Sequence, residues 1–274
     1  MKRREFFRTA GIVSAALMVG GTEASAHQSE VEDRYVKDYL EKMRNFNRRH
    51  EDDMVVTGDR LELLKSCRTK LARIQRVVGY GNFNILGFDD ALKVARNYDS
   101  LTGGLERKEI DFYEELFDGD AHLYGFYGEK VLDRITATIG NREVVKIPHT
   151  GHYLFKGEPV RVYEAIRKQM GDTVVLTSGV RGVAKQMYLF VNKAVDTGGN
   201  LSMASRSLAP PGYSFHGAGD FDVGKKGFGY RNFTEDFART DEYKKLRDLG
   251  YIDIRYPMGN LYGVRYEPWH VKVV

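Results

Sequence analysis

The spacing of apolar residues changes near residue 143, and this change constrains the fold more than any other feature of the chain. Before it, residues 60–78 carry apolar side chains three and four positions apart, which is the spacing of one face of an α-helix. Residues 30–48, 88–98 and 106–117 predict three further helices. After it, short runs rich in β-branched residues alternate with helical segments. We therefore expect an α+β fold, with a C-terminal antiparallel sheet and flanking helices, preceded by a mostly helical N-terminal region.

The region after residue 143 is expected to contain two helices and several strands. Residues 159–170 and 182–195 predict the helices, and the short apolar run 174–176 is typical of a buried strand. A polar loop is expected to follow the second helix. Strand-like pieces lie near the end of the chain, separated by glycine, proline and asparagine, at 251–257, 261–267 and 270–274.

The first 26 residues have the layout of a signal peptide. A basic head, which contains Arg3 and Arg4, precedes an uncharged stretch at 10–21 that is too short to span a bilayer. The arginine pair followed by Phe6 is similar to a twin-arginine signal, a route that exports folded proteins. We therefore expect export to the periplasm or cell envelope. The mature chain would then comprise a helical N-terminal region, 27–140, and a C-terminal domain, 141–274.

Composition excludes several classes of function. Removal of residues 1–26 would lower the net charge from +4 to +2, which gives no concentrated basic face for nucleic acid. No later segment has the long apolar run of a membrane helix, so no integral membrane segment is expected after signal cleavage. Cys67 is the only cysteine, which excludes intramolecular disulfides and a metal site built from several thiolates. Any metal must therefore be bound by His, Asp and Glu.

Candidate metal ligands occur in the segment "YSFHGAGDFDVG", residues 213–224. His216 precedes Asp220 and Asp222, and the two carboxylates share one face if this segment is a strand. A histidine on a loop and an aspartate on the strand that follows can converge on one ion. The alternative is an ordinary turn rich in glycine and aspartate.

A second candidate segment is Glu267-Pro-Trp-His270. Pro268 has no backbone N–H and restricts the residue before it, so the chain must bend here. The bend can aim Glu267 and His270 into one pocket; the alternative is a half-buried histidine near the chain end. A catalytic zinc needs three protein ligands, an open position for water and a nearby carboxylate as general base. Two histidines and an aspartate, with Glu267 uncoordinated, meet this requirement.

Arg181 is a third candidate, in the segment "TSGVRG", residues 177–182. Ser178 and Gly179 end the preceding strand, and the arginine lies where a helix is expected to begin. There its planar guanidinium can bind a carboxylate or the oxyanion of a tetrahedral intermediate. The alternative is a surface arginine in a salt bridge.

Taken together, these segments resemble the zinc D,D-peptidases of the VanY and VanX type. The family pattern is S-G-Y-R-S…Q, then S-x-H-x-x-G-x-A-x-D, then E-x-x-H. This chain has, in the same order, Ser178-Gly-Val-Arg181…Gln186, Ser214-x-His216-x-x-Gly219…Asp222 and Glu267-x-x-His270. The resemblance covers about residues 145–274. It implies one Zn²⁺ per chain, bound by His216, Asp222 and His270.

The resemblance also implies roles for three residues around the metal. Glu267 would be the catalytic base, Arg181 would steady the substrate carbonyl or carboxylate, and Ser214 would lie near the substrate. Two positions depart from the family pattern. Val180 replaces the usual tyrosine, and the interval from His216 to the aspartate is one residue shorter than usual.

The shortened interval leaves two candidates for the third ligand. Either Asp222 coordinates through a tightened loop, or Asp220 takes its place. We favour Asp222, because Val223 and a glycine follow it, as a hydrophobic residue follows the family's aspartate.

The function that the resemblance implies is an exported zinc-dependent D,D-carboxypeptidase acting on peptidoglycan stem peptides, most simply on their terminal D-Ala-D-Ala. Zinc would activate water, Glu267 would transfer its proton to the leaving amine, and Arg181 would stabilise negative charge. One alternative is an endopeptidase of the same family that cuts cross-links. Another is a non-catalytic peptidoglycan-binding protein that keeps the fold. Glu267 argues against the latter, because zinc binding alone needs no base.

Overall fold

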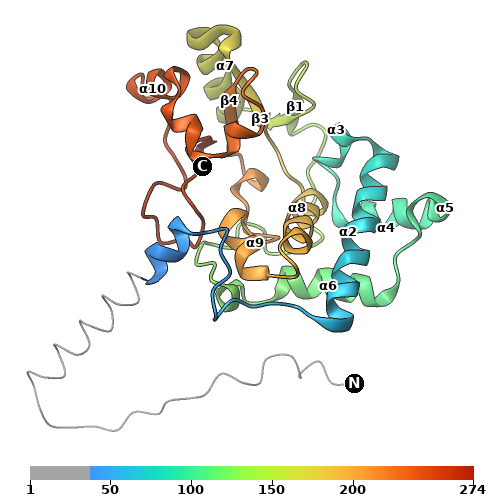
Figure 1. Cartoon of the computed structure of the whole chain (residues 1–274). Coiled ribbons are helices and arrows are strands. Elements are labelled where there is room, and N and C mark those ends of the chain that lie inside the picture. The colour runs from blue at the N-terminus through green and yellow to red at the C-terminus, as the bar shows by residue number, and fades with distance from the viewer. Residues whose placement is uncertain (1–37) are drawn as a thin grey trace, which may run out of the picture. The chain divides into compact units, whose positions relative to one another are not determined.

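The computed structural model describes residues 38–274. The expected signal peptide, 1–26, lies outside the described residues, as does the first part of the helix expected at 30–48. Residues 38–44 of that helix are helical. Residues 40–274 form one compact unit (Figure 1). Within the described part of the chain, no helix has the length and apolar character needed to cross a membrane.

The N-terminal part of this unit is helical, as the sequence predicts. Three helices correspond to the expected ones: α2 (Gly58–Val78), α4 (Phe88–Asn97) and α6 (Arg107–Asp118). Two short helices connect them, α3 (Tyr80–Phe83) and α5 (Asp99–Thr102). The apolar face of α2 is buried, including Leu64, Leu71 and Ile74. The regular spacing in the sequence therefore identified the face that packs.

Helices α8 (Val183–Asp196) and α9 (Leu201–Ser207) complete the hydrophobic core of this helical part. Helix α8 confirms the helix expected at 182–195, whereas α9 lies where a polar loop was expected. Asn200 caps α9 by accepting a hydrogen bond from the N–H of Met203 at 2.7 Å. The α9 residue Arg206 is buried against Asp53 at 2.6 Å. This serine-rich helix has no apolar repeat that would predict it from the sequence. It is stabilised instead by its cap and by tertiary contacts.

A second hydrophobic core surrounds a three-stranded antiparallel sheet of order β3–β4–β5. Its strands are β3 (Val174–Ser178), β4 (Phe221–Lys225) and β5 (His270–Val271). Helices α7 (Glu158–Met170) and α10 (Asp241–Asp248) contribute to the same core, and Figure 1 shows them beside these strands. A separate hairpin pairs β1 (Val144–Lys146) with β2 (Tyr153–Phe155). The expected α+β fold is confirmed.

Two of the three strand-like pieces expected near the chain end are not strands. In 251–257 only Ile254 pairs, in an isolated bridge, and no residue of 261–267 joins a sheet. Val264 is instead buried in the helical core. Gly263, at φ 81°, packs so closely that a side chain would overlap the carbonyl oxygen of Gly125. The two pieces pack as loops: Ile252 and Ile254 contact the core around the sheet, and Tyr256 and Val264 the helical core.

Candidate active site

The register of the sheet brings the candidate ligands together. Asp222 lies in the central strand β4, opposite Ser178 of β3 and His270 of β5. The short 3-10 helix Phe215–Gly217 carries His216 to the same place. The ligand atoms of His216, Asp222 and His270 all lie within 4.8 Å of one another, and all three residues are buried. The fold therefore brings together three predicted ligands that are up to 54 residues apart in the sequence.

His216 is oriented by the backbone that follows β3. Its Nδ1 donates to the carbonyl oxygen of Gly179 at 2.8 Å, so the lone pair is on Nε2, which faces Oδ1 of Asp222 at 3.2 Å. Gly179 fits here because a side chain would overlap the Tyr153 carbonyl oxygen. Burial, together with the cation of Arg181, lowers the pKa of His216 to about 4. The imidazole is therefore neutral at pH 7, which is the form that binds metals.

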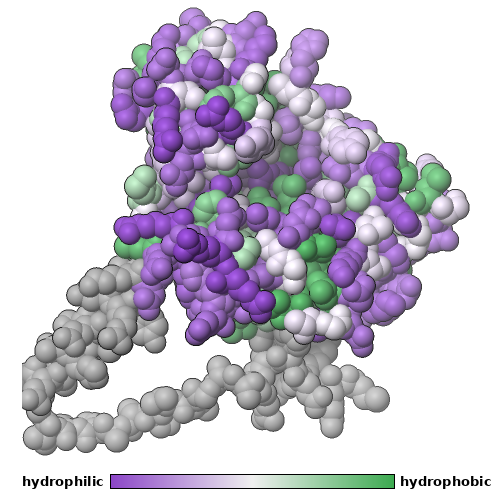
Figure 2. Space-filling view, viewed as in Figure 1, coloured by the Kyte–Doolittle hydropathy of each residue, from purple (hydrophilic) through white to green (hydrophobic). Residues whose placement is uncertain are grey.

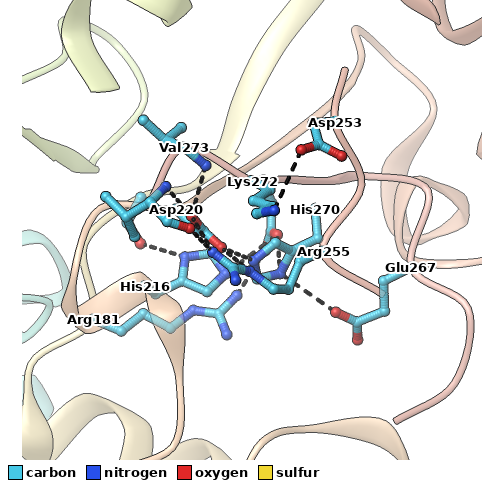
Figure 3. A network of polar contacts seen from close by, with 12 residues as sticks. Arg181, His216, Asp220, Asp253, Arg255, Glu267, His270, Lys272 and Val273 are labelled. Atoms are coloured by element: carbon cyan, nitrogen blue, oxygen red, sulfur yellow. Dashed lines mark hydrogen bonds and ion pairs between the residues drawn. The ribbon is translucent and has the colours of Figure 1, made fainter. Parts of the chain in front are cut away.

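His270 presents its other ring nitrogen to the same point. Its Nε2 donates to Oδ2 of Asp220 at 3.1 Å, while Nδ1 lies 3.5 Å from both Oδ1 of Asp222 and Oε2 of Glu267 (Figure 3). Burial opposes the charged form of His270, but the hydrogen bonds with Asp220 and Glu267 outweigh it and raise its pKa to about 9. A metal cation at Nδ1 would take the place of that proton.

The three side chains fit a zinc ion. Within the described residues, Nε2 of His216 and Oδ1 of Asp222 are buried without a hydrogen-bond partner, a state that costs about 1–3 kcal/mol for each group. Two ligand atoms about 2.0–2.1 Å from zinc at a tetrahedral angle lie roughly 3.3–3.4 Å apart. The distances from Oδ1 of Asp222 to the facing nitrogens of His216 and His270 are 3.2 and 3.5 Å. Two imidazoles and one carboxylate also leave the fourth position open.

Asp220 is held differently from Asp222. Its carboxylate accepts hydrogen bonds from Nε of Arg255 at 2.8 Å, from the backbone N–H of Val273 at 2.8 Å, and from His270. Burial raises the pKa of Asp220, but these contacts outweigh it and hold the pKa well below the ordinary range. Both oxygens of Asp220 are therefore engaged, whereas Asp222 keeps one oxygen directed at the histidines.

Figure 3 shows Arg181 near His216 and Glu267 near His270. Arg181 donates from Nε to Oγ of Ser178 at 2.9 Å and from Nη2 to Oδ2 of Asp222 at 2.7 Å. It therefore binds the oxygen of Asp222 that does not face His216. Glu267 is buried and directs its carboxylate toward Nδ1 of His270.

A cavity of about 350 Å³ opens over these residues. Figure 2 shows this face of the molecule hollowed between the part that holds α7 and α10 and the part that holds α9. The lining includes every predicted site residue: Arg181, Ser214, His216, Asp222, Glu267 and His270. Val180, which replaces the family's tyrosine, is buried and does not line the cavity. The cavity therefore has the size and position of a site for a small peptide.

The structure adds residues that sequence reasoning missed. His152, Lys185, Lys193 and Arg265 also line the cavity. The sequence could have indicated Lys185 and Lys193, because both lie in the helix expected at 182–195, which follows the candidate residue Arg181 directly. Gln186, which belongs to the motif, instead donates a hydrogen bond to the carbonyl of Ala209 inside the protein.

Residues 160–274 match the model of the VanY family, described as D-alanyl-D-alanine carboxypeptidase. This match confirms, for the C-terminal part of the chain, the resemblance inferred from the motifs. No curated protein sequence matches the chain.

The solved structures similar to this one include the following three. A mutant of the vancomycin-resistance D,D-pentapeptidase VanY from the VanB-type resistance cassette, in complex with Zn(II), is 22% identical, with 48% of this chain and 78% of that chain covered and a TM-score of 0.40. VanYB in complex with D-alanine-D-alanine is 18% identical, with coverages of 55% and 86% and a TM-score of 0.42. The vancomycin-resistance D,D-dipeptidase VanXYg, in complex with a D-Ala-D-Ala phosphinate analogue, is 18% identical, with coverages of 55% and 64% and a TM-score of 0.41.

Proposed function

We propose that this protein is an exported zinc-dependent D,D-carboxypeptidase that removes the terminal residue from peptidoglycan stem peptides ending in D-Ala-D-Ala. One observation carries the proposal: Nε2 of His216 and Oδ1 of Asp222 are buried without hydrogen bonds, at zinc-ligand spacing and beside the carboxylate of Glu267. The family match of residues 160–274 supports the reaction class. The signal peptide expected at 1–26 supports export to the compartment that contains the polymer.

The proposed ligands are Nε2 of His216, Oδ1 of Asp222 and Nδ1 of His270. Asp220 acts in this proposal as the carboxylate that fixes His270, because its hydrogen bond to Nε2 leaves Nδ1 directed at the metal position. Arg181 orients Asp222 similarly, because its hydrogen bond to Oδ2 leaves Oδ1 directed at the metal position. The ligand set is thus oriented by partners that do not themselves bind zinc.

Zinc bound at this site would polarise the scissile carbonyl and lower the pKa of a water molecule. Glu267, whose carboxylate lies 3.5 Å from Nδ1 of His270, accepts a proton from the attacking water and passes it to the leaving amine. Arg181 lines the cavity beside Asp222 and stabilises the negative charge that develops on the carbonyl oxygen. The buried position of these groups strengthens each electrostatic interaction relative to water.

The test is to incubate purified muropeptides with the protein, with and without a metal chelator, and to identify the products by mass. Loss of one alanine from the stem, abolished by the chelator and restored by zinc, is the expected result. Conversion of cross-linked dimers to monomers would instead indicate the endopeptidase. No change in either substrate would refute the proposed hydrolysis.

A matched pair of variants tests the base. Glu267→Gln should retain about one zinc per chain but lose hydrolysis, because the amide cannot accept the proton. Glu164→Gln, an exposed position on α7, is the control and should match the unmodified protein. Full activity of Glu267→Gln would show that another group acts as the base.

A further inference from the structure

Helix α8 presents two lysines to the cavity beside the candidate metal site. Lys185, Leu189 and Lys193 are four residues apart, so they share one side of the helix, and all three line the cavity. Arg265, from the loop before β5, lines it as well. We call Lys193 and Arg265 the distal cation pair. None of these basic residues has a place in the proposed hydrolysis.

Within the described residues, neither lysine of α8 nor Arg265 forms an ion pair, although carboxylates pair with most other buried basic groups here. Arg206 pairs with Asp53, and Arg255 pairs with Asp220. Arg265 donates only from Nη2 to a backbone carbonyl, and its Nε is buried without a hydrogen-bond partner. The guanidinium also stacks over the Trp269 ring at 4.8 Å. Its charge therefore lies at the cavity wall without a direct ion pair among the described residues, although the charges of Glu267 and Glu235 act on it without contact.

The basic side chains of the cavity form two groups of like charge. Burial, together with the cation of Arg181, lowers the pKa of Lys185 to about 8. Burial and the cation of Arg265 lower the pKa of Lys193, and the opposing effect of Asp196 is smaller. Each lysine thus responds to a different arginine. Two mutually repelling cations in a partly buried wall weaken the folded state, and an anionic ligand would relieve that repulsion.

The spacing of the two groups indicates the shape of the ligand. Lys185 and Lys193 are eight residues apart on α8, which corresponds to about 12 Å along the helix axis. A single carboxylate cannot contact both positions. An extended peptide advances about 3.3–3.6 Å per residue, so 12 Å corresponds to roughly three to four residues. A peptide with two carboxylates at that separation matches both groups.

We propose that the cavity selects acidic peptides: the chain-end carboxylate lies toward Arg181 and Lys185, and a side-chain carboxylate three to four residues earlier binds the distal cation pair. The inference rests on the proposed function and adds the substrate class. It makes Lys193 and Arg265 determinants of specificity. Charge-assisted hydrogen bonds of this kind are stronger than neutral ones, so an amide in place of the side-chain carboxylate would bind more weakly.

Two synthetic peptides that both end in D-Ala-D-Ala test this inference. They are identical except for Glu or Gln three residues before the terminal alanine. With the zinc-loaded protein, we expect kcat/KM for the Glu peptide to be about tenfold higher than for the Gln peptide. In Lys193→Met the ratio should fall toward one. The control Lys168→Met removes an exposed lysine of α7 and should keep the tenfold ratio.

Direct binding separates this inference from the proposed hydrolysis. In the Glu267→Gln background, calorimetry should show about tenfold tighter binding of the Glu peptide, lost on adding Lys193→Met. Hydrolysis of both peptides at equal kcat/KM would overturn the acidic subsite and leave the hydrolysis standing. The same preference in Lys193→Met as in the unmodified protein would also overturn it. Selective binding of the Glu peptide, with no hydrolysis of either peptide by the unmodified protein, would refute the proposed hydrolysis and support the acidic subsite.

Discussion

Removal of Asp220 and removal of Asp222 should affect different properties of the protein. Asp222 supplies the one carboxylate oxygen of the trio that is buried and unpartnered within the described residues, so Asp222→Ala takes away a zinc ligand. Asp220 has no free oxygen, because Arg255, His270 and the backbone of Val273 occupy both. Asp220→Ala should therefore act mainly on stability, and only indirectly on zinc.

The magnitudes follow from these contacts. Asp220→Ala leaves the Arg255 side chain, which is 12% exposed, without its carboxylate. Breaking a buried ion pair costs about 3–5 kcal/mol, and the partial exposure of Arg255 places the expected loss of unfolding free energy near the lower figure. Loss of support for His270 should weaken zinc binding about 10–100-fold. Asp222→Ala should weaken it by more than that, because one of three protein ligands is gone.

Zinc affinity is measured by competition with a chromogenic chelator, and stability by urea unfolding of the metal-free protein. Asp220→Asn and Asp222→Asn are the matched controls, because they keep the side-chain shape and remove the charge. Zinc binding that survives in Asp222→Ala but is lost in Asp220→Ala would transfer the ligand assignment to Asp220 and refute this reasoning.

Three other changes test the surrounding structure. Arg181→Lys cannot bind Ser178 and Asp222 together, so kcat should fall about 10²–10³-fold when measured at saturating zinc. Zinc affinity should also weaken, up to about 10–100-fold, because Asp222 loses part of its support. Burial raises the pKa of Asp53, but hydrogen bonds from Arg206 and other donors lower it to about 2, below the ordinary 3.8. Its stabilising contribution is therefore complete above about pH 4 and is lost toward pH 2, so urea unfolding at pH 7 and pH 3 should differ less in Asp53→Asn. Gly263→Ala would overlap the Gly125 carbonyl and should lower the melting temperature in a thermal scan.

Helices could be predicted where their own sequence carried the apolar repeat. Helix α2 buries Leu64, Leu71 and Ile74 on one face, and its expected and observed bounds nearly coincide. Helix α9 has no such repeat and depends on the buried pair of Arg206 with Asp53, a residue about 150 positions earlier. A contact between residues so far apart cannot be predicted from local apolar periodicity, because the sequence around one residue does not identify the other.

The site was predictable as a set of residue types, but its internal arrangement was not. Alternation along a strand placed Asp220 and Asp222 on one face, and by that reasoning they were equivalent. In the structure β4 begins at Phe221, so Asp220 precedes the strand, where Gly219 adopts φ 150°. The pairing of Asp222 with His270 across β4 and β5 then directs one carboxylate at the histidine's Nδ1, while Asp220 reaches Nε2 of the same ring. The two carboxylates thus contact opposite sides of the His270 ring, and the register between β4 and β5, which the local sequence does not show, determines which carboxylate faces Nδ1.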